Sequence, residues 1–345
     1  MLAAMLTAVI PCFRVKRHIL GVLAAIPRTV DRIYVVDDGC PEGSGDAVEA
    51  GCTDPRVRVL RHERNRGVGA ATLTGYRAAL ADGATLIVRL DGDGQMDPAL
   101  IPRLVRPIAE GEADYTKGNR FFELEGLSAM PPLRLVGNSI LSFASKLSSG
   151  YWNVFDPTNG FTAIHAAVLR QLPLDKLSPD WFFESDLLFR LGTIRAVVCD
   201  VPIPARYGDE KSSLVVRRVV AGFAWKHLSN AAKRIFYSYY LRNFNIASIE
   251  IVVGLASLAF GSFVGLRHWW MSHATATPAT SGTVMLAALP VIVGVQLLLA
   301  FLSYDLQNVP REPLSVAAGD DHELVVREEA SDRARERERV GAQRR

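Results

Sequence analysis

The stretch ATLIVRLDGDGQ, residues 84–95, decides the fold, because a run rich in apolar and β-branched residues passes there directly into a turn of Asp and Gly. Short apolar runs bounded by turn residues predict buried strands. Similar runs stand at residues 7–13, 32–38 and 57–63, and the segments between them, such as 67–83, have the composition of helices that end at Gly. This alternation predicts an α/β domain with a doubly wound sheet.

Composition restricts the class of protein further. The chain has 345 residues, of which 22% are charged and 49% hydrophobic, and its formal net charge is +3. These values exclude a disordered chain, a collagen and a disulfide-stapled miniprotein, and they argue against a nucleic-acid partner. The four cysteines form no CxxC pair, which indicates a reducing compartment.

Acidic side chains follow two of the predicted strands, where ligands of doubly wound sheets bind. Asp37 and Asp38 follow the second strand, and Asp91, Asp93 and Gln95 follow the fourth. Two carboxylates on a short turn, with an amide oxygen beside them, are suitable ligands for Mg²⁺ or Mn²⁺ that also binds a diphosphate. Asp and Gly are also ordinary turn residues, but the Asp-Asp-Gly sequence after the second strand, at residues 37–39, favours the metal interpretation.

Two long apolar segments follow the α/β part. Residues 246–266 contain one charge, Glu250, and residues 284–304 contain none, so each has about the ~20 residues needed to cross a bilayer. They predict a transmembrane hairpin, the alternative being two buried helices of a soluble core. The expected organisation is a catalytic domain at 1–210, basic amphipathic helices at 211–244, the hairpin at 245–306 and a charged tail at 307–345.

Basic residues set the expected orientation. Seven lysines and arginines and no acidic residue lie between Lys211 and Arg242, whereas the loop between the spans has only Arg267 besides its histidines. The positive-inside rule therefore places the N-terminal domain and the tail in the cytoplasm. The basic segment also suits helices that lie on an anionic membrane surface, although an ordinary solvated basic helix is the alternative.

Six short motifs occur in one order along the chain: residues 11–13, 36–39, 65–69, 90–95, 118–120 and 159–161. As a set they resemble family 2 glycosyltransferases with the GT-A fold. The resemblance is strongest to the polyprenyl-phosphate hexosyltransferases, the group of dolichol-phosphate mannose synthase and bactoprenol glucosyltransferase. It covers residues 5–305, because that branch also has a basic juxtamembrane helix and a membrane hairpin.

The resemblance implies roles for individual residues. It implies that the nucleotide sugar is bound by Pro11, Phe13, Asp37, Asp38, Gly67, Gly69 and Asp91. It also implies that Asp91, Asp93 and Gln95 bind the metal and assist departure of the diphosphate. Arg120 and Arg134 match the arginines that hold the acceptor phosphate. A guanidinium binds a phosphate bidentately and stays charged, although either arginine is also explained as a surface residue.

Asp156, Glu184 and Asp186 are candidates for a catalytic base. A sugar hydroxyl as acceptor requires a base, whereas a lipid phosphate is already an anion at neutral pH and requires positioning. Glu184 and Asp186 also suit a helix N-terminus, where the helix dipole favours acidic residues.

Three functions follow from these observations. The first is an inverting transferase that moves a hexose from a UDP- or GDP-linked sugar to a polyprenyl phosphate of the undecaprenyl or dolichyl type, with Mg²⁺ or Mn²⁺ as cofactor. The second is transfer to a hydroxyl of a membrane glycolipid, and the third is a catalytically silent nucleotide-sugar-binding scaffold. The partners expected are the donor, the lipid acceptor and the membrane, and a homo-oligomer is left open.

Overall fold

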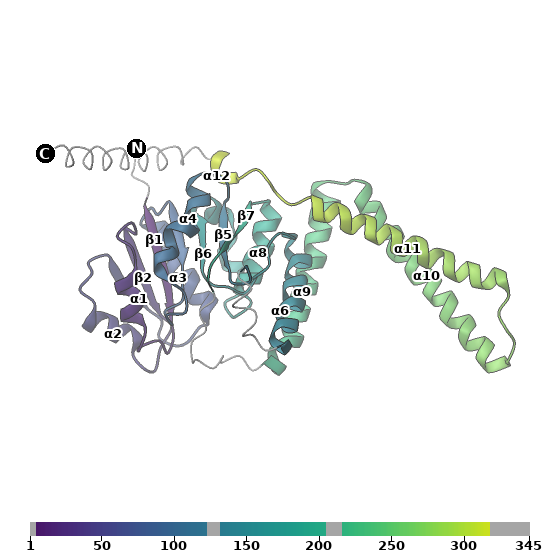
Figure 1. Cartoon of the computed structure of the whole chain (residues 1–345), viewed down its shortest axis with the longest axis horizontal. Helices are drawn as coiled ribbons and strands as arrows, with labels where there is room; N and C mark the ends of the chain where they lie inside the picture. Colours follow the sequence, from purple (N-terminus) through teal and green to yellow (C-terminus); the bar gives the residue numbers. More distant parts are fainter. Residues whose placement is uncertain (1–4, 123–131, 205–215, 318–345) are drawn as a thin grey trace. The chain divides into compact units, whose positions relative to one another are not determined.

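The computed structural model describes residues 5–122, 132–204 and 216–317. The chain forms two compact units, one of residues 1–231 with 310–345 and the other of residues 232–309 (Figure 1). The side chain of Arg134, the first residues of the expected 211–244 segment and most of the expected tail lie outside the described residues.

The first unit is built on a mixed sheet. In the described part of the chain this sheet has seven strands in the order β3-β2-β1-β4-β6-β5-β7. The strands are β1 (Leu6–Cys12), β2 (Arg32–Asp37), β3 (Val57–Arg61), β4 (Leu86–Arg89), β5 (Tyr115–Asn119), β6 (Thr162–His165) and β7 (Val198–Pro202). The first four strands lie in the runs that the sequence predicted, so the expected α/β fold is confirmed.

One strand reverses the direction of the sheet. β6 pairs antiparallel with β4 and with β5, whereas β1, β2, β3 and β4 pair in parallel, as do β5 and β7. Thr162, the first residue of β6, lies opposite Arg89 of β4 and Lys117 of β5. Because an antiparallel strand begins where its neighbours end, the loop before β6 lies at the carboxyl ends of β4 and β5.

Helices cover both faces of the sheet, and alternate residues of β1 show which face each helix covers. Ile10 packs in one hydrophobic core with residues of α1 and α4, while Val9 lies against Gly75 of α3 on the other face. The helices of this unit are α1 (Ile19–Ala25), α2 (Ser44–Gly51), α3 (Val68–Ala81), η1 (Pro98–Leu100), α4 (Ile101–Ala109), α6 (Pro132–Ser149), α7 (Ala166–Gln171), η2 (Leu174–Lys176), α8 (Phe183–Ile194), α12 (Leu314–Ala317) and most of α9 (Val216–Phe236).

The second unit is a helical hairpin. After the π-helical turn η3 (Tyr237–Arg242), the two antiparallel helices are α10 (Ile246–Thr275) and α11 (Ser281–Gln307). They approach closely at glycines: a Cβ added to Gly261 would lie 2.6 Å from the carbonyl oxygen of Ala287. Small residues allow such close helix packing, as they do between membrane helices.

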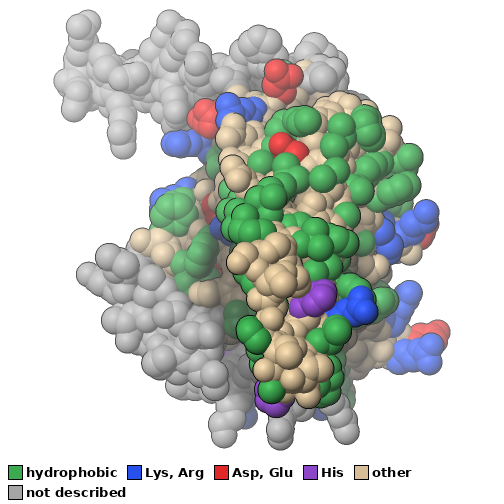
Figure 2. All heavy atoms as spheres, turned by 90° about the vertical axis from the view of Figure 1, so that its right-hand side faces the viewer, with side chains coloured by type: hydrophobic (Ala, Val, Ile, Leu, Met, Phe, Trp, Pro, Cys, Tyr) green, Lys and Arg blue, Asp and Glu red, His purple; other side chains and the backbone are tan. Residues whose placement is uncertain are grey.

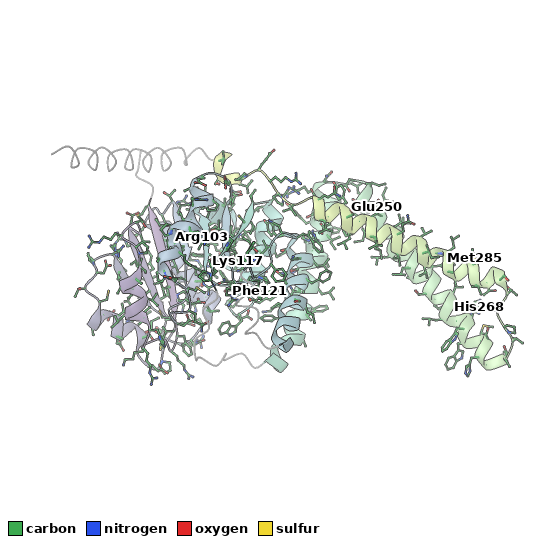
Figure 3. All side chains as sticks on the ribbon, in the orientation of Figure 1. Arg103, Lys117, Phe121, Glu250, His268 and Met285 are labelled. Carbon is green, nitrogen blue, oxygen red and sulfur yellow. The ribbon has the colours of Figure 1, made fainter. Side chains whose placement is uncertain are left out.

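The outer faces of the hairpin are apolar and exposed. Both helices are long and apolar enough to cross a membrane, and only 11% of the most apolar 18-residue window of each is buried. Figure 2 shows hydrophobic side chains over much of the hairpin, and Figure 3 places Glu250 near the start of α10 and His268 and Met285 near the connecting loop. This exposure disagrees with the alternative of two buried helices in a soluble core.

A buried ion pair joins the two ends of the second unit. Asp305 of α11 accepts hydrogen bonds from Arg234 Nη1 at 2.7 Å and Nη2 at 2.9 Å, and from the Tyr239 hydroxyl at 2.5 Å. Arg234 is 5% and Asp305 3% exposed, so each charge depends on the other for its compensation. The pair therefore fixes the segment entering the hairpin to the segment leaving it.

The chain returns to the first unit after the hairpin. The buried carboxylate of Asp114, just before β5, accepts backbone N–H bonds from Leu314 at 2.9 Å and Ser315 at 2.8 Å, and from Val197 at 2.8 Å. Asp114 thus binds the first turn of α12 to the sheet. The segments before and after the hairpin consequently belong to the same folded unit.

We expect Asp305→Ala to lower the free energy of unfolding by about 3–5 kcal/mol, because it leaves the Arg234 guanidinium buried without its partner. Denaturant unfolding in detergent micelles, followed by tryptophan fluorescence, measures this loss. The double variant Arg234→Met with Asp305→Leu is the control, because it removes both charges and should unfold nearer the wild type. Wild-type stability in Asp305→Ala would contradict the role given to the pair.

Candidate active site

Four segments form one pocket at the carboxyl ends of β4, β5 and β7. They are the turn after β4, the residue after β5, the two residues after β7 and the loop before β6, which reaches this edge because β6 runs opposite to its neighbours. The lining residues are Asp91, Asp93, Gln95, Met96, Arg120, Thr158, Asn159, Gly160, Ile203 and Pro204. Figure 3 shows Lys117 of β5 and Phe121, which follows Arg120, inside this unit.

The turn after β4 contributes Asp91, Asp93 and Gln95 to the lining of the pocket. The carboxylate of Asp93 accepts the backbone N–H of Gln95 at 2.9 Å, and Gly94 has a φ of 80°, which favours glycine. Asp97 caps η1 through the N–H of Ala99 at 3.0 Å and precedes Pro98, which suits the first position of a helix. The structure therefore brings Asp91, Asp93 and Gln95 together in one pocket wall.

A buried arginine orients the first of these carboxylates. Arg89 Nη2 donates to Asp91 Oδ1 at 2.8 Å, and Arg89 Nη1 donates to Glu184 of α8. Burial alone lowers the pKa of Arg89, but the charges of Asp91 and Glu184 outweigh it and raise that pKa above its usual value. Arg89 interrupts a strand that the sequence analysis treated as apolar, and that interruption was the signal for its role.

Glu184 and Gly160 lie next to the ion pair of Arg89 and Asp91. Glu184 is 7% exposed and pairs with Arg89, so its position suits support of Asp91 better than attack on a substrate. A Cβ added to Gly160 would lie 2.8 Å from Arg89 Nη1 and 2.9 Å from Asp91 Oδ2. Glycine is therefore the residue that lets the loop before β6 pass over this ion pair.

The opposite side of the pocket is basic. Arg120 donates from Nε to Asp156 Oδ2 at 2.8 Å and from Nη2 to Asp156 Oδ1 at 3.1 Å. The side chain of Asp156 is 2% exposed and that of Arg120 is 30% exposed. Asp156 thus holds the guanidinium in one orientation while part of it remains open to the pocket.

Asp186 belongs to a different contact. Its carboxylate accepts from the backbone N–H of Ser178 at 3.0 Å, from Arg190 Nε at 3.2 Å and from Asn230 Nδ2 at 3.2 Å. Asn230 lies in α9, so Asp186 joins α8 to α9 and lies outside the pocket lining of the described residues. These contacts indicate that Asp186 stabilises the packing of α8 against α9.

Asp37 and Asp38 are buried beside the same sheet edge and organise two loops. Asp37 accepts backbone N–H bonds from Cys40 and Gly45, both at 2.7 Å. Asp38 accepts those of Arg66 at 2.9 Å and Gly67 at 2.8 Å, and His62 Nδ1 lies 2.6 Å from it. Asp37 therefore fixes the segment of residues 40–45, and Asp38 fixes the segment that contains Gly67, for which the family resemblance implies nucleotide binding.

The other residues predicted to bind the nucleotide sugar also lie at this edge of the sheet. Pro11 is buried at the end of β1, whereas Phe13 just beyond it is 39% exposed. A Cβ added to Gly67 would lie 2.5 Å from the carbonyl oxygen of Pro179, and a Cβ added to Gly69 would lie 2.4 Å from that of Ser178. The two glycines are therefore required for close packing of the segment before α8, and their contact with a nucleotide stays a prediction.

The donor set of the pocket fits a hard divalent cation. Asp91 and Asp93 supply carboxylate oxygens and Gln95 an amide oxygen, and Arg89 donates to Oδ1 of Asp91. Within residues 5–122, 132–204 and 216–317, no group of three or more His, Cys, Asp or Glu side chains forms a ready metal cage. An ion held by the two aspartates would therefore take further oxygen ligands from substrate and water, as Mg²⁺ commonly does.

Solved structures share this fold. Glucosyl-3-phosphoglycerate synthase from Mycobacterium tuberculosis, crystallised with Mn²⁺, uridine diphosphate and phosphoglyceric acid, superposes with a TM-score of 0.51 at 18% identity, over 67% of this chain and 78% of that one. The mixed sheet is therefore of the GT-A type, which confirms the predicted fold class.

Sequence comparison identifies the family. Glycosyl transferase family 2 matches residues 7–172. The UDP-N-acetylglucosamine–dolichyl-phosphate N-acetylglucosaminyltransferase of Methanococcus voltae is 28% identical over 62% of this chain and 90% of its own length. The undecaprenyl-phosphate mannosyltransferase of Micrococcus luteus is 31% identical over 50% of this chain and 70% of its own length. The chain belongs to glycosyl transferase family 2, as its motifs predicted.

We expect Asp93→Ala to abolish Mn²⁺ binding in the presence of a nucleoside diphosphate, because one of the two carboxylate ligands is lost. Electron paramagnetic resonance of the Mn²⁺ ion measures this binding without any turnover. Asp97→Ala is the matched control, since it removes a carboxylate of the same segment and costs only about 1 kcal/mol of capping energy. Unchanged Mn²⁺ binding in Asp93→Ala would refute the metal assignment.

Proposed function

We propose that the protein transfers a hexose from a UDP- or GDP-linked sugar to polyprenyl phosphate, with inversion, at the cytoplasmic face of a membrane. One observation carries the proposal: Arg120, oriented by Asp156, lines the same pocket as Asp91 and Asp93. The pocket thus offers carboxylates for a metal-bound diphosphate and a guanidinium for a phosphate acceptor. The names of the relatives, which act on dolichyl phosphate and undecaprenyl phosphate, support the same acceptor class.

On the donor side, the chain's own residues prepare the leaving group. Arg89 holds the Asp91 carboxylate, and the Gln95 N–H holds that of Asp93, so both are oriented before substrate binds. A bound Mg²⁺ or Mn²⁺ would neutralise the charge that develops on the departing nucleoside diphosphate. Asp37 and Asp38 keep the neighbouring loops in place for the nucleotide.

On the acceptor side, the nucleophile is a phosphate oxygen. The second pKa of a phosphate monoester is near ~6, so the acceptor is largely a dianion at neutral pH and needs positioning rather than deprotonation. That oxygen forms the new bond to the anomeric carbon as the bond from this carbon to the diphosphate oxygen breaks. A single displacement of this kind inverts the anomeric configuration and needs no carboxylate nucleophile.

Transfer to a hydroxyl is less well supported, because it requires a carboxylate that is open to a proton. The three candidates are each engaged by a guanidinium: Asp156 by Arg120, Glu184 by Arg89 and Asp186 by Arg190. A silent scaffold is also disfavoured, since the pocket keeps both aspartates and the arginine in position.

The membrane orientation rests on two observations. Asp114 binds the first turn of α12 to the catalytic unit, so the chain before and after the hairpin folds on one side. The basic segment from Lys211 to Arg242 precedes the first span, which favours the cytoplasm for that side. The hairpin would then anchor the catalytic unit beside its lipid substrate.

The direct test incubates the purified full chain in detergent with Mg²⁺ or Mn²⁺, a panel of radiolabelled nucleotide sugars, and undecaprenyl phosphate, and then extracts the lipid. Label in the lipid phase that depends on the phosphate, and not on free undecaprenol, is the expected result. Label transferred to undecaprenol or to a glycolipid instead would overturn the proposal.

We expect Arg120→Lys to lose most of the transfer activity, because an ammonium cannot reproduce the two-point contact of a guanidinium with phosphate. Acceptor KM should rise more than donor KM. Glu184→Gln and Asp186→Asn should cost less than the ~10²–10⁴-fold typical of losing a general base. The rates of these variants with undecaprenyl phosphate between pH 5 and 9 distinguish a phosphate acceptor from a hydroxyl acceptor. An inactive carboxamide variant, together with an Arg120→Lys variant as active as the wild type, would favour the hydroxyl acceptor.

We expect cysteine labelling in intact cells to reach only the loop between the spans, around residues 276–280, while sites in the catalytic unit and after Pro310 stay protected until the membrane is opened. The background is a variant in which Cys12, Cys40, Cys52 and Cys199 are replaced by Ser, with activity as the control for folding. A tail labelled from outside would mean that one of the two helices does not cross.

A further inference from the structure

We propose that Lys117, a buried lysine of β5, is a positioning residue that holds the 156–160 turn between the donor carboxylates and the acceptor arginine. The inference deepens the proposed function and rests on it. The side chain of Lys117 is fully buried, and Nζ donates a hydrogen bond to the backbone carbonyl oxygen of Asn159. Figure 3 labels this lysine within the sheet unit.

The carbonyl that Lys117 holds ends a tight turn. The backbone N–H of Asn159 lies 3.5 Å from the carbonyl oxygen of Asp156, and Pro157 occupies the second position, where its fixed φ suits such a turn. The Asn159 side chain donates to the Gly118 carbonyl oxygen at 2.7 Å. Two hydrogen bonds therefore join this turn to β5, one from Lys117 and one to the residue after it.

The two ends of the turn contact the two sides of the pocket. Asp156, at its start, holds Arg120 in a bidentate contact. Gly160, immediately after it, lies against Asp91 and Arg89 so closely that an added Cβ would not fit. A shift of Asn159 would move Arg120 relative to Asp91, and a 1 Å misplacement of reacting groups can cost ~10²-fold in rate.

The chemistry of the position argues for more than packing. An ammonium at a fully buried site is costly, and an apolar side chain of similar length would fill the same space without that cost. Burial lowers the pKa of Lys117 to about 8, with Glu184 of α8, Asp156 of the turn and Asp200 of β7 opposing the shift and Arg89 of β4 adding to it. Lys117 is thus protonated at neutral pH, and it loses its charge as the pH rises through about 8.

The test compares Lys117→Met with Lys146→Met in the transfer assay between pH 6.5 and 9.5. Lys146 of α6 also donates to a backbone carbonyl of the loop before β6, that of Trp152 at 3.0 Å, but it lies outside the pocket lining and serves as the matched control. In Lys117→Met we expect kcat to fall ~10–100-fold, with donor KM changed less than about threefold. Lys146→Met should keep the wild-type kcat.

The pH profile separates a positioning charge from a simple loss of packing. Wild-type kcat should decline above pH about 8, where Lys117 loses its proton, and this decline should be missing from the residual activity of Lys117→Met. A folded Lys117→Met enzyme with wild-type kcat would overturn the inference. If that variant does not fold, the inference is overturned by a kcat of the wild-type enzyme that stays constant up to pH 9.5. A wild-type enzyme without transfer to any lipid phosphate would instead refute the proposed function.

Discussion

The reversed direction of β6 is the constraint on which the site depends. Since β6 runs against β4 and β5, the loop before it reaches the edge where those strands end, and there it meets the carboxylates of one strand and the arginine of the other. A parallel β6 would place that loop at the opposite edge of the sheet. Asp91 and Arg120 would then face a pocket without the wall formed by Thr158, Asn159 and Gly160.

Much of the fold was predictable because it depends on local patterns. The first four strands, the helix at 68–81 and the cap at Asp97 follow from apolar runs, turn residues and capping preferences near in sequence. The convergence of Asp91, Asp93 and Gln95 also follows, since they share one turn. The direction of β6 does not follow, because its four residues carry no local signal that distinguishes a parallel from an antiparallel neighbour.

The supporting residues of the site were harder to predict for a related reason. Arg89 and Lys117 act through partners 95 and 42 positions away, Glu184 and Asn159, and such pairs cannot be read from spacing along the chain. From the sequence alone Glu184 and Asp156 were therefore candidate bases, and in the structure Glu184 pairs with Arg89 and Asp156 with Arg120. Charged residues inside apolar strands were the available signal, because a buried charge persists in a fold only with a partner.

Buried charges also stabilise each of the two units separately. In the first unit, Arg89, Lys117 and Asp156 make buried contacts with Glu184, Asn159 and Arg120, and the last two of these partners line the pocket. The second unit contains one buried ion pair, Arg234 with Asp305, at the ends of two helices whose outer faces are apolar. Each unit is therefore held by its own polar contacts, and α12 on Asp114 returns the chain to the catalytic unit after the hairpin.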